Sequence, residues 1–88
     1  MPISVTTPTA EQIDTAKAWP IWTHDVATFP WEYATSETCL IVEGRATVVA
    51  ADCSDEASFG SGDMVVFPAG LKCTWTIHEH IRKHYAFG

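Results

Sequence analysis

The chain has 88 residues, enough for one domain, and a domain of this size buries only about 60–65% of the surface that its unfolded chain exposes. Its core must therefore hold large side chains, and four Trp, four Phe and two Tyr meet that need. The net charge of −6, from five Lys and Arg against eleven Asp and Glu, excludes the basic surface that nucleic acids and anionic membranes require. We expect neither as a partner.

The first element that the sequence predicts is a short helix over residues 10–18. Thr9 and Gln12 have the spacing of a capping box, in which each side chain bonds the backbone N–H of the other residue. The helix ends before Trp19-Pro20 because a residue that precedes proline is pushed out of the helical conformation. We expect this helix to form a lid on one end of a barrel.

From residue 21 onward the apolar residues follow a period of two, which is typical of strands. Many short strands at regular spacing predict an all-β sandwich or barrel, and closing the sheet removes edges that would otherwise aggregate. Turn residues separate the segments, and two of the expected turns are Glu43-Gly44 and Glu79-His80. We expect one domain, with an N-terminal arm and helix over residues 1–18 and the barrel over residues 19–88. The predicted strands cover residues 21–26, 29–33, 38–42, 45–51, 57–59, 64–67, 72–77 and 83–87.

Three cysteines, Cys39, Cys53 and Cys73, form an odd set without a CxxC pair. A secreted disulfide scaffold would show an even number, so we interpret all three as reduced thiols. Residues 1–5 lack the basic region and apolar core of a signal peptide, and no apolar run is long enough to span a bilayer. We therefore expect a cytoplasmic protein.

Two stretches carry spacings that together point to a known fold. In the first, the segment 31–33 (Trp-Glu-Tyr) is followed after three residues by Glu37, and Glu37 after six more by Gly44. In the second, Gly62 is followed after five residues by the segment 68–70 (Pro-Ala-Gly). These glycines suit tight turns with a positive φ, and the proline presets φ in a turn.

These spacings resemble the two motifs of the cupin superfamily, G-x5-H-x-H-x3/4-E-x6-G and G-x5-P-x-G-x2-H-x3-N. The resemblance covers about residues 19–87 and implies a single jelly-roll-type barrel. Within the superfamily the chain is most similar to the small cupins of the ureidoglycine aminohydrolase and ethanolamine-utilisation group, most of which lack an assigned activity. The segments that carry this closer likeness are 19–22, 36–39, 67–75 and 82–85.

The chain departs from the two motifs at the positions that bind a metal in the family. In the family pattern, two histidines, the glutamate and the second-motif histidine bind a divalent metal. This chain has Trp31, Tyr33, Glu37 and Cys73 at those positions. Indole offers no lone pair and a neutral phenol is a poor ligand, so two ligands remain where zinc sites use three or four. We expect no metal site and no cofactor.

Glu37 is the main candidate for chemistry in the barrel. A carboxylate is almost never buried without a partner. In a purely structural role, Glu37 pairs with Lys83, Lys72 or Arg45, or it reaches solvent at the barrel mouth. In a functional role, it is a general acid/base or a substrate anchor with a raised pKa. The cupin position of Glu37 favours the functional interpretation.

Cys73, Lys83 and His84 complete the candidate catalytic set. A thiol such as Cys73 becomes a nucleophile when a base or cation lowers its pKa, although a free cysteine is more often a small buried hydrophobe. Strand alternation sends His84 to the face opposite Lys83 and Tyr85. The sequence leaves open which of these two faces lines the barrel.

Aromatic side chains predict a stacking surface for a small organic ligand. Each of them could equally be plain core, and we assign Trp22 to the core. A second pair of histidines, His78 and His80, forms an H-x-H outside the motif, and we expect it in a surface turn and not in a metal site. The candidate ligand-binding residues are Trp31, Tyr33, Cys39, Phe67, Trp75 and Tyr85.

The sequence leaves three functions open. The first is a metal-independent barrel that binds a small polar organic ligand. The second is a metal-independent enzyme of the lyase, isomerase or hydrolase type that uses Glu37 with Lys83, His84 or Cys73 as acid and base groups. The third is an assembly protein, because small barrels often pair to supplement a limited core, and we expect a homodimer.

Overall fold

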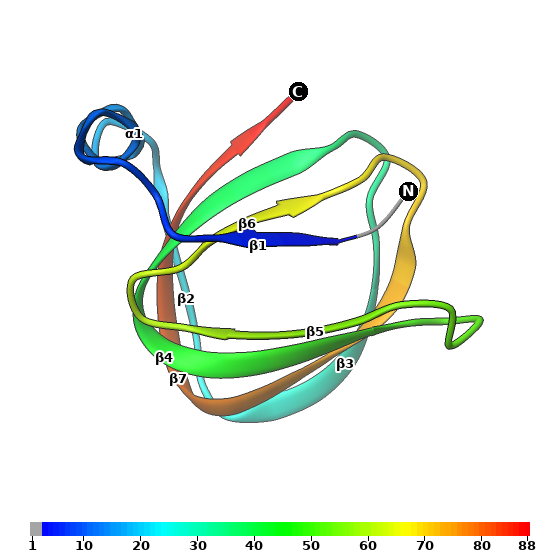
Figure 1. Cartoon of the computed structure of the whole chain (residues 1–88). Coiled ribbons are helices and arrows are strands. Elements are labelled where there is room, and N and C mark those ends of the chain that lie inside the picture. Colours follow the sequence, from blue (N-terminus) through cyan, green and yellow to red (C-terminus); the bar gives the residue numbers. More distant parts are fainter. Residues whose placement is uncertain (1–2) are drawn as a thin grey trace.

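The computed structural model describes residues 3–88, in which every regular element except one short helix is a β-strand. Seven strands form one sheet, which curls into an open barrel (Figure 1). The prediction of an all-β barrel with a short N-terminal helix is therefore confirmed. The elements are β1 (Ser4–Thr6), α1 (Ala10–Ala16), β2 (Ile21–His24), β3 (Ala27–Glu32), β4 (Glu37–Ala50), β5 (Glu56–Gly60), β6 (Met64–Phe67) and β7 (Lys72–Phe87).

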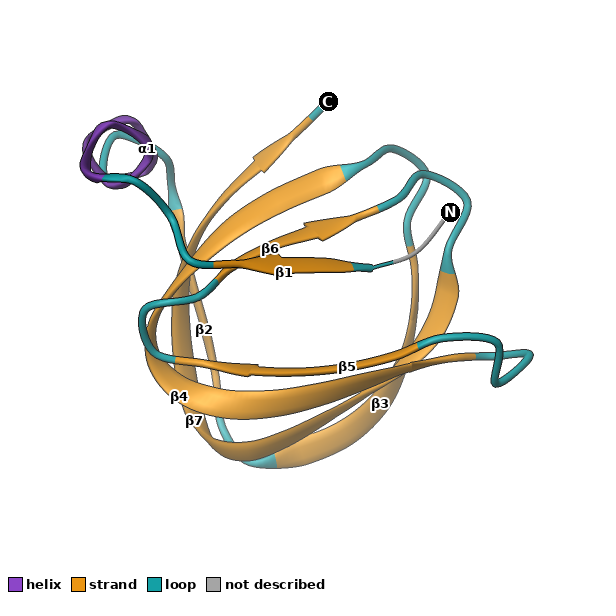
Figure 2. Ribbon diagram, in the orientation of Figure 1, coloured by secondary structure: helices purple, strands orange, loops and turns teal. Residues whose placement is uncertain are grey.

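Two long strands, β4 and β7, are the centre of the sheet. They pair antiparallel from Glu37 opposite Phe87 to Ala50 opposite Cys73. β5 and β6 pair with β4, and β2 and β3 pair with β7. Figure 2 shows how these strands wrap around a common interior. All pairings are antiparallel, so side chains alternate between the interior and the outside along each strand.

The predicted turns at Glu43-Gly44 and Glu79-His80 are wrong, because β4 and β7 run through both positions. Register shifts between the two strands mark β-bulges around Glu43 and Arg45. Gly44 has φ +92°, and a Cβ there would overlap the carbonyl oxygen of His80. Bulges use the same glycine and polar residues as turns, so the sequence signal does not distinguish them.

The H-x-H pair is consequently on a strand and not in a turn. Nδ1 of His80 lies 2.7 Å from Oδ1 of Asp25, and Nε2 of His78 lies 2.8 Å from Oγ1 of Thr47. Both contacts are exposed. The prediction that this pair lies at the surface agrees with these contacts, whereas its assignment to a turn is wrong.

The N-terminal helix begins as predicted. The backbone N–H of Gln12 donates to Oγ1 of Thr9 at 3.2 Å, and the N–H of Thr9 donates to Oε1 of Gln12 at 2.9 Å. This is the capping box inferred from the spacing. The helix ends at Ala16, two residues before the predicted end at residue 18.

The helix does not cover an end of the barrel. Ala16 packs with Leu40 and Met64 in a cluster that is separate from the interior core. Leu40 lies between Cys39 and Ile41, whose side chains point inward, so it faces out from β4. The helix therefore covers the outer face of β4 and β6, because alternation leaves two apolar side chains there to be buried.

The arm before the helix adds a strand to the sheet, with Val5 opposite Val65 of β6. Residues 1 and 2, on which part of the expectation of no signal peptide rests, lie outside the described residues. In residues 3–88, no helix is long and apolar enough to cross a membrane. The cysteines of this part of the chain are free thiols, two of them buried.

We predict that Gly44→Ala destabilises the protein far more than Gly62→Ala. Both glycines have a positive φ, of +92° and +93°, which costs an L-residue about 1–2 kcal/mol. Only Gly44 also approaches a neighbouring backbone, whereas nothing lies within 4 Å of a Cβ at Gly62. Urea unfolding should show a loss of about 1 kcal/mol for Gly62→Ala and at least about twice that for Gly44→Ala. Equal losses would contradict the close approach of β4 to β7.

Candidate functional site

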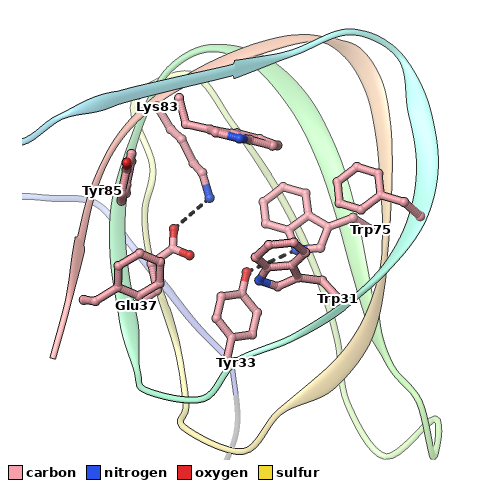
Figure 3. A pocket seen from close by; sticks show the side chains of 9 residues that line it. Trp31, Tyr33, Glu37, Trp75, Lys83 and Tyr85 are labelled. Atoms are coloured by element: carbon pink, nitrogen blue, oxygen red, sulfur yellow. Dashed lines mark hydrogen bonds and ion pairs between the residues drawn. The ribbon is translucent and has the colours of Figure 1, made fainter.

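A pocket of about 240 Å³ lies in the barrel between β2, β3, β4 and β7. Its walls are almost entirely aromatic, and its only carboxylate and only ammonium come from β4 and β7. Two of the aromatic side chains, Trp31 and Phe87, are half exposed and mark the mouth. Figure 3 shows the side chains pointing toward a common centre. The lining residues are Trp22, Phe29, Trp31, Tyr33, Glu37, Trp75, Lys83, Tyr85 and Phe87.

Glu37 and Lys83 form a buried ion pair inside this pocket. Nζ of Lys83 donates to Oε2 of Glu37 at 2.7 Å, and the two side chains are 6% and 5% exposed. Of the three partners left open by the sequence, Lys83 is thus the one observed. Arg45 instead contacts Glu79 at the surface, because the bulges in β4 change the inward-facing positions from odd numbers to even numbers.

The Lys83 ammonium lies between aromatic faces as well as beside the carboxylate. Its Nζ is 4.9 Å from the ring centroid of Trp22, 4.8 Å from that of Trp75 and 6.0 Å from that of Phe67. At such distances the negative faces of the rings attract a cation. The carboxylate and the rings together stabilise the charged form of a lysine that has little access to water.

Tyr33 supplies a second polar group to the pocket. Nε1–H of Trp75 donates to its hydroxyl oxygen at 3.1 Å, and its ring stacks on Phe67 with centroids 4.9 Å apart. Burial, reinforced by the nearby Glu37 carboxylate, raises the pKa of Tyr33 well above its usual value. The phenol therefore keeps its proton, and within residues 3–88 that proton has no acceptor.

Strand alternation in β7 resolves the face that the sequence left open. Lys83 and Tyr85 point into the pocket. His84 points to the outside, where its Nδ1 donates to the carbonyl oxygen of Trp19 at 3.0 Å. The structure thus places His84, a predicted catalytic residue, away from Glu37 because neighbours on a strand face opposite sides of the sheet.

The two buried thiols also lie outside the pocket lining. The Cys39 thiol donates to the Val65 carbonyl oxygen at 3.7 Å, and the Cys73 thiol donates to the Trp31 carbonyl oxygen at 3.6 Å. Burial raises the pKa of Cys39 to about 12 and also raises the pKa of Cys73. Neither thiol has the lowered pKa that a nucleophile needs.

Phe67, a predicted ligand-binding residue, is fully buried beneath the pocket, where it supports Tyr33 and Trp75. Three lining residues were not assigned to the site from the sequence: Trp22, Phe29 and Phe87. Phe29 shares the alternation of Trp31 and could have been found. Trp22, which we assigned to the core, reaches the pocket only because β2 pairs with β7, where it lies opposite Lys83.

The residues at the four metal-ligand positions of the cupin motifs do not fit a divalent metal. Trp31 offers an indole, the Tyr33 phenol is held neutral, and the Cys73 thiol donates to a carbonyl oxygen. Glu37 already has a cation beside it. Elsewhere in residues 3–88, no group of three or more His, Cys, Asp or Glu side chains could hold a metal ion.

Comparison with protein families finds one match, over residues 11–85, to the model described as the EutQ-like cupin domain. Comparison with curated proteins finds none. Among solved structures, a DUF861 family protein from Thermotoga maritima is 39% identical, with a TM-score of 0.92 over 98% of this chain and 99% of that one.

More distant structures share the fold. The EutQ protein of Clostridium difficile is 21% identical, with a TM-score of 0.68 over 76% of this chain and 52% of that one. A putative ethanolamine utilization protein Q from Salmonella typhimurium is 20% identical, with a TM-score of 0.66 over 97% of this chain and 68% of that one. The likeness to the Thermotoga maritima protein extends over the whole barrel, including the segments that form the pocket.

We predict that removing one member of the ion pair costs more stability than removing both. Lys83→Met leaves the Glu37 carboxylate buried without a partner, which costs about 3–5 kcal/mol. The double variant Glu37→Gln/Lys83→Met leaves no unpaired charge and should unfold at a higher urea concentration than Lys83→Met alone. Lys72→Met, a change of an exposed lysine on the same strand, serves as the control. A double variant less stable than Lys83→Met would contradict the buried pair.

We also predict that iodoacetamide labels one thiol of the native protein at pH 8. Cys53 is exposed, whereas Cys39 and Cys73 are buried and their pKa values are raised, so neither presents a thiolate at this pH. Mass spectrometry should find one adduct in the native protein and three after denaturation in urea. Rapid native labelling of Cys73 would show that it is an accessible nucleophile.

Proposed function

We propose that this chain, which belongs to the EutQ-like cupin family, binds a small organic molecule in its barrel through aromatic walls and one buried pair of opposite charges. The match over residues 11–85 shows the family membership and confirms the resemblance inferred from the sequence. The observation that carries the proposal is the Glu37–Lys83 pair, buried among aromatic rings yet lining a pocket with an open mouth. An apolar pocket with a few convergent polar groups is the usual form of a small-molecule site.

The cost of the ion pair supports a role beyond stability. Replacing a buried ion pair with apolar side chains of similar volume is often neutral or stabilising. The barrel has no shortage of apolar residues, since Ile41 and Cys39 lie on the same face of β4 as Glu37. A charge pair placed where it lines a pocket is therefore better explained by contact with a ligand.

The aromatic walls define the shape of the molecule that fits. The rings of Phe29 and Trp75 are parallel within 4°, with centroids 6.3 Å apart, and Trp31 forms part of the mouth. Flat side chains of this kind favour a planar or apolar ligand body. The pocket volume of about 240 Å³ is below the ~300–1,000 Å³ of sites for drug-sized molecules, so a single-ring compound is the appropriate size.

A metal-independent enzyme is the second candidate, and the 2.7 Å contact of Glu37 with Lys83 favours it. A carboxylate and an ammonium in contact can exchange a proton with a substrate as base and acid. One variant distinguishes the two functions. Glu37→Gln should abolish turnover if the protein is an enzyme, whereas a binding protein has no turnover to lose.

The proposal predicts that single-ring aromatic compounds contact three of the four tryptophans. Trp22, Trp31 and Trp75 line the pocket, whereas Trp19 packs outside the barrel against the helix. In two-dimensional ¹H–¹⁵N NMR spectra, titration with a bound compound should shift the indole N–H signals of the first three and leave that of Trp19 unchanged. Absence of binding by a panel of neutral, cationic and anionic single-ring compounds, or an equal shift of Trp19, would contradict the proposal.

Trp31→Ala tests the mouth of the pocket. Trp31 is 50% exposed and packs edge-on against Tyr33, so its loss should lower the free energy of unfolding by about 2 kcal/mol, less than the ~3–5 kcal/mol for a fully buried tryptophan. Compounds that shift the pocket signals should bind at least about five-fold more weakly, because stacking on one aromatic face contributes ~1 kcal/mol or more. Val26→Ala, an exposed position outside the pocket, is the matched control and should leave binding unchanged.

A further inference from the structure

From the proposed binding function, on which this step rests, we infer that the pocket selects a ligand whose buried end is uncharged and both donates and accepts a hydrogen bond, as a primary carboxamide does. The inference comes from the charges and the free hydrogen-bonding positions that the pocket presents. Nine side chains line the pocket, so its charges and its free hydrogen-bonding groups can be counted.

The charges of the pocket are already balanced. Its lining contains one carboxylate, Glu37, and one ammonium, Lys83, and otherwise only aromatic side chains, two of them phenols. The pair is in direct contact, so an anionic ligand that approaches Lys83 also meets Glu37. A cationic ligand that approaches Glu37 also meets Lys83. Neither kind of ligand therefore finds a partner whose charge is free.

The aromatic walls of the pocket make it unfavourable for a charged ligand group to enter without a partner of opposite charge. A ligand that enters loses water, and aromatic side chains do not replace the hydration of a full charge unless it is a cation over a free ring face. The ring faces of Trp22 and Trp75 already contact the Lys83 ammonium. A neutral group loses much less on leaving water, so it is favoured over an isosteric ion.

The free hydrogen-bonding positions are of both kinds. In residues 3–88, Oε2 of Glu37 accepts the hydrogen bond from Lys83, while Oε1 has no hydrogen-bond partner. No fully buried polar side-chain atom of these residues is left unpaired, so Oε1 must be accessible from the pocket. The Tyr33 hydroxyl proton and further N–H bonds of Lys83 provide donors. A carboxamide N–H fits Glu37, and its carbonyl oxygen fits Tyr33 or Lys83.

The restriction applies only to the end of the ligand that enters the barrel. Trp31 and Phe87 are 50% and 58% exposed at the mouth, so a group at the outer end of the ligand stays in water. A charged substituent there does not lose its hydration. The inferred class is therefore a planar molecule with a neutral, carboxamide-like inner end.

Four probes of nearly the same shape test the inference on the unmodified protein. Benzamide is neutral with an N–H donor, acetophenone is neutral without one, benzoate is an anion and benzamidinium is a cation at pH 7. Titrations followed by the indole signals of Trp22 and Trp75 should show benzamide binding at least about ten-fold more tightly than either ion, and more tightly than acetophenone. Tighter binding of benzoate or benzamidinium would overturn the inference.

Charge variants test the cause of the selectivity. Glu37→Gln gives the pocket a net positive charge and should move the preference from benzamide to benzoate. Lys83→Met gives it a net negative charge and should move the preference to benzamidinium, while the double variant should again favour benzamide. Glu43→Gln, an exposed site on the same strand, should keep the order of the unmodified protein. An unchanged order in both single variants would overturn the inference.

These outcomes separate the inference from the proposed function. If none of the four probes shifts the pocket tryptophans at millimolar concentration, the aromatic pocket does not bind single-ring ligands, and the proposed function fails together with the selectivity. If a charged probe binds best at the same tryptophans, the binding function stands and only the charge argument fails. Acetophenone binding as tightly as benzamide would exclude Glu37 as the acceptor of a ligand N–H.

Discussion

The register between β4 and β7 fixes the positions of nearly everything else in this barrel. The two strands pair from end to end, and a one-residue slip would turn every side chain to the opposite face. The close approach of Gly44 to the backbone of His80 lies at the bulges where the register between the two strands shifts. Because the register is fixed there, Lys83 and Tyr85 face inward, and Glu37 of β4 meets Lys83 of the neighbouring strand β7.

Of the four residues that bind a metal in the cupin motifs, this chain keeps only the glutamate, Glu37, and the glutamate pairs with Lys83. The scaffold keeps the glycines and the proline of the two motifs, while the ligand positions hold an indole, a phenol and a hydrogen-bonded thiol. The retained glutamate pairs with the Lys83 ammonium, which also lies over the faces of Trp22 and Trp75. The pocket is consequently neutral overall, and its strongest discrimination should concern charge.

Local features of the sequence predicted local structure well. Thr9 and Gln12 form the expected capping box, since a cap depends only on residues within one helical turn. The glycine at position 44 was correctly expected to have a positive φ but was wrongly assigned to a turn. Whether such a glycine ends a strand or bulges within it depends on the partner strand, which is about 35 residues away in the chain.

The sequence by itself determined the cupin barrel, the alternation that groups inward side chains, and the loss of the family's metal-binding histidines, because these depend on residue type and spacing. Only the tertiary structure decided that Lys83 is the partner of Glu37, a residue 46 positions away. It also decided that His84 and both buried thiols lie outside the pocket and that Trp22, Phe29 and Phe87 line it. The reason is that each of these placements depends on which strands pair and in what register, and long-range pairing leaves no mark in any one segment.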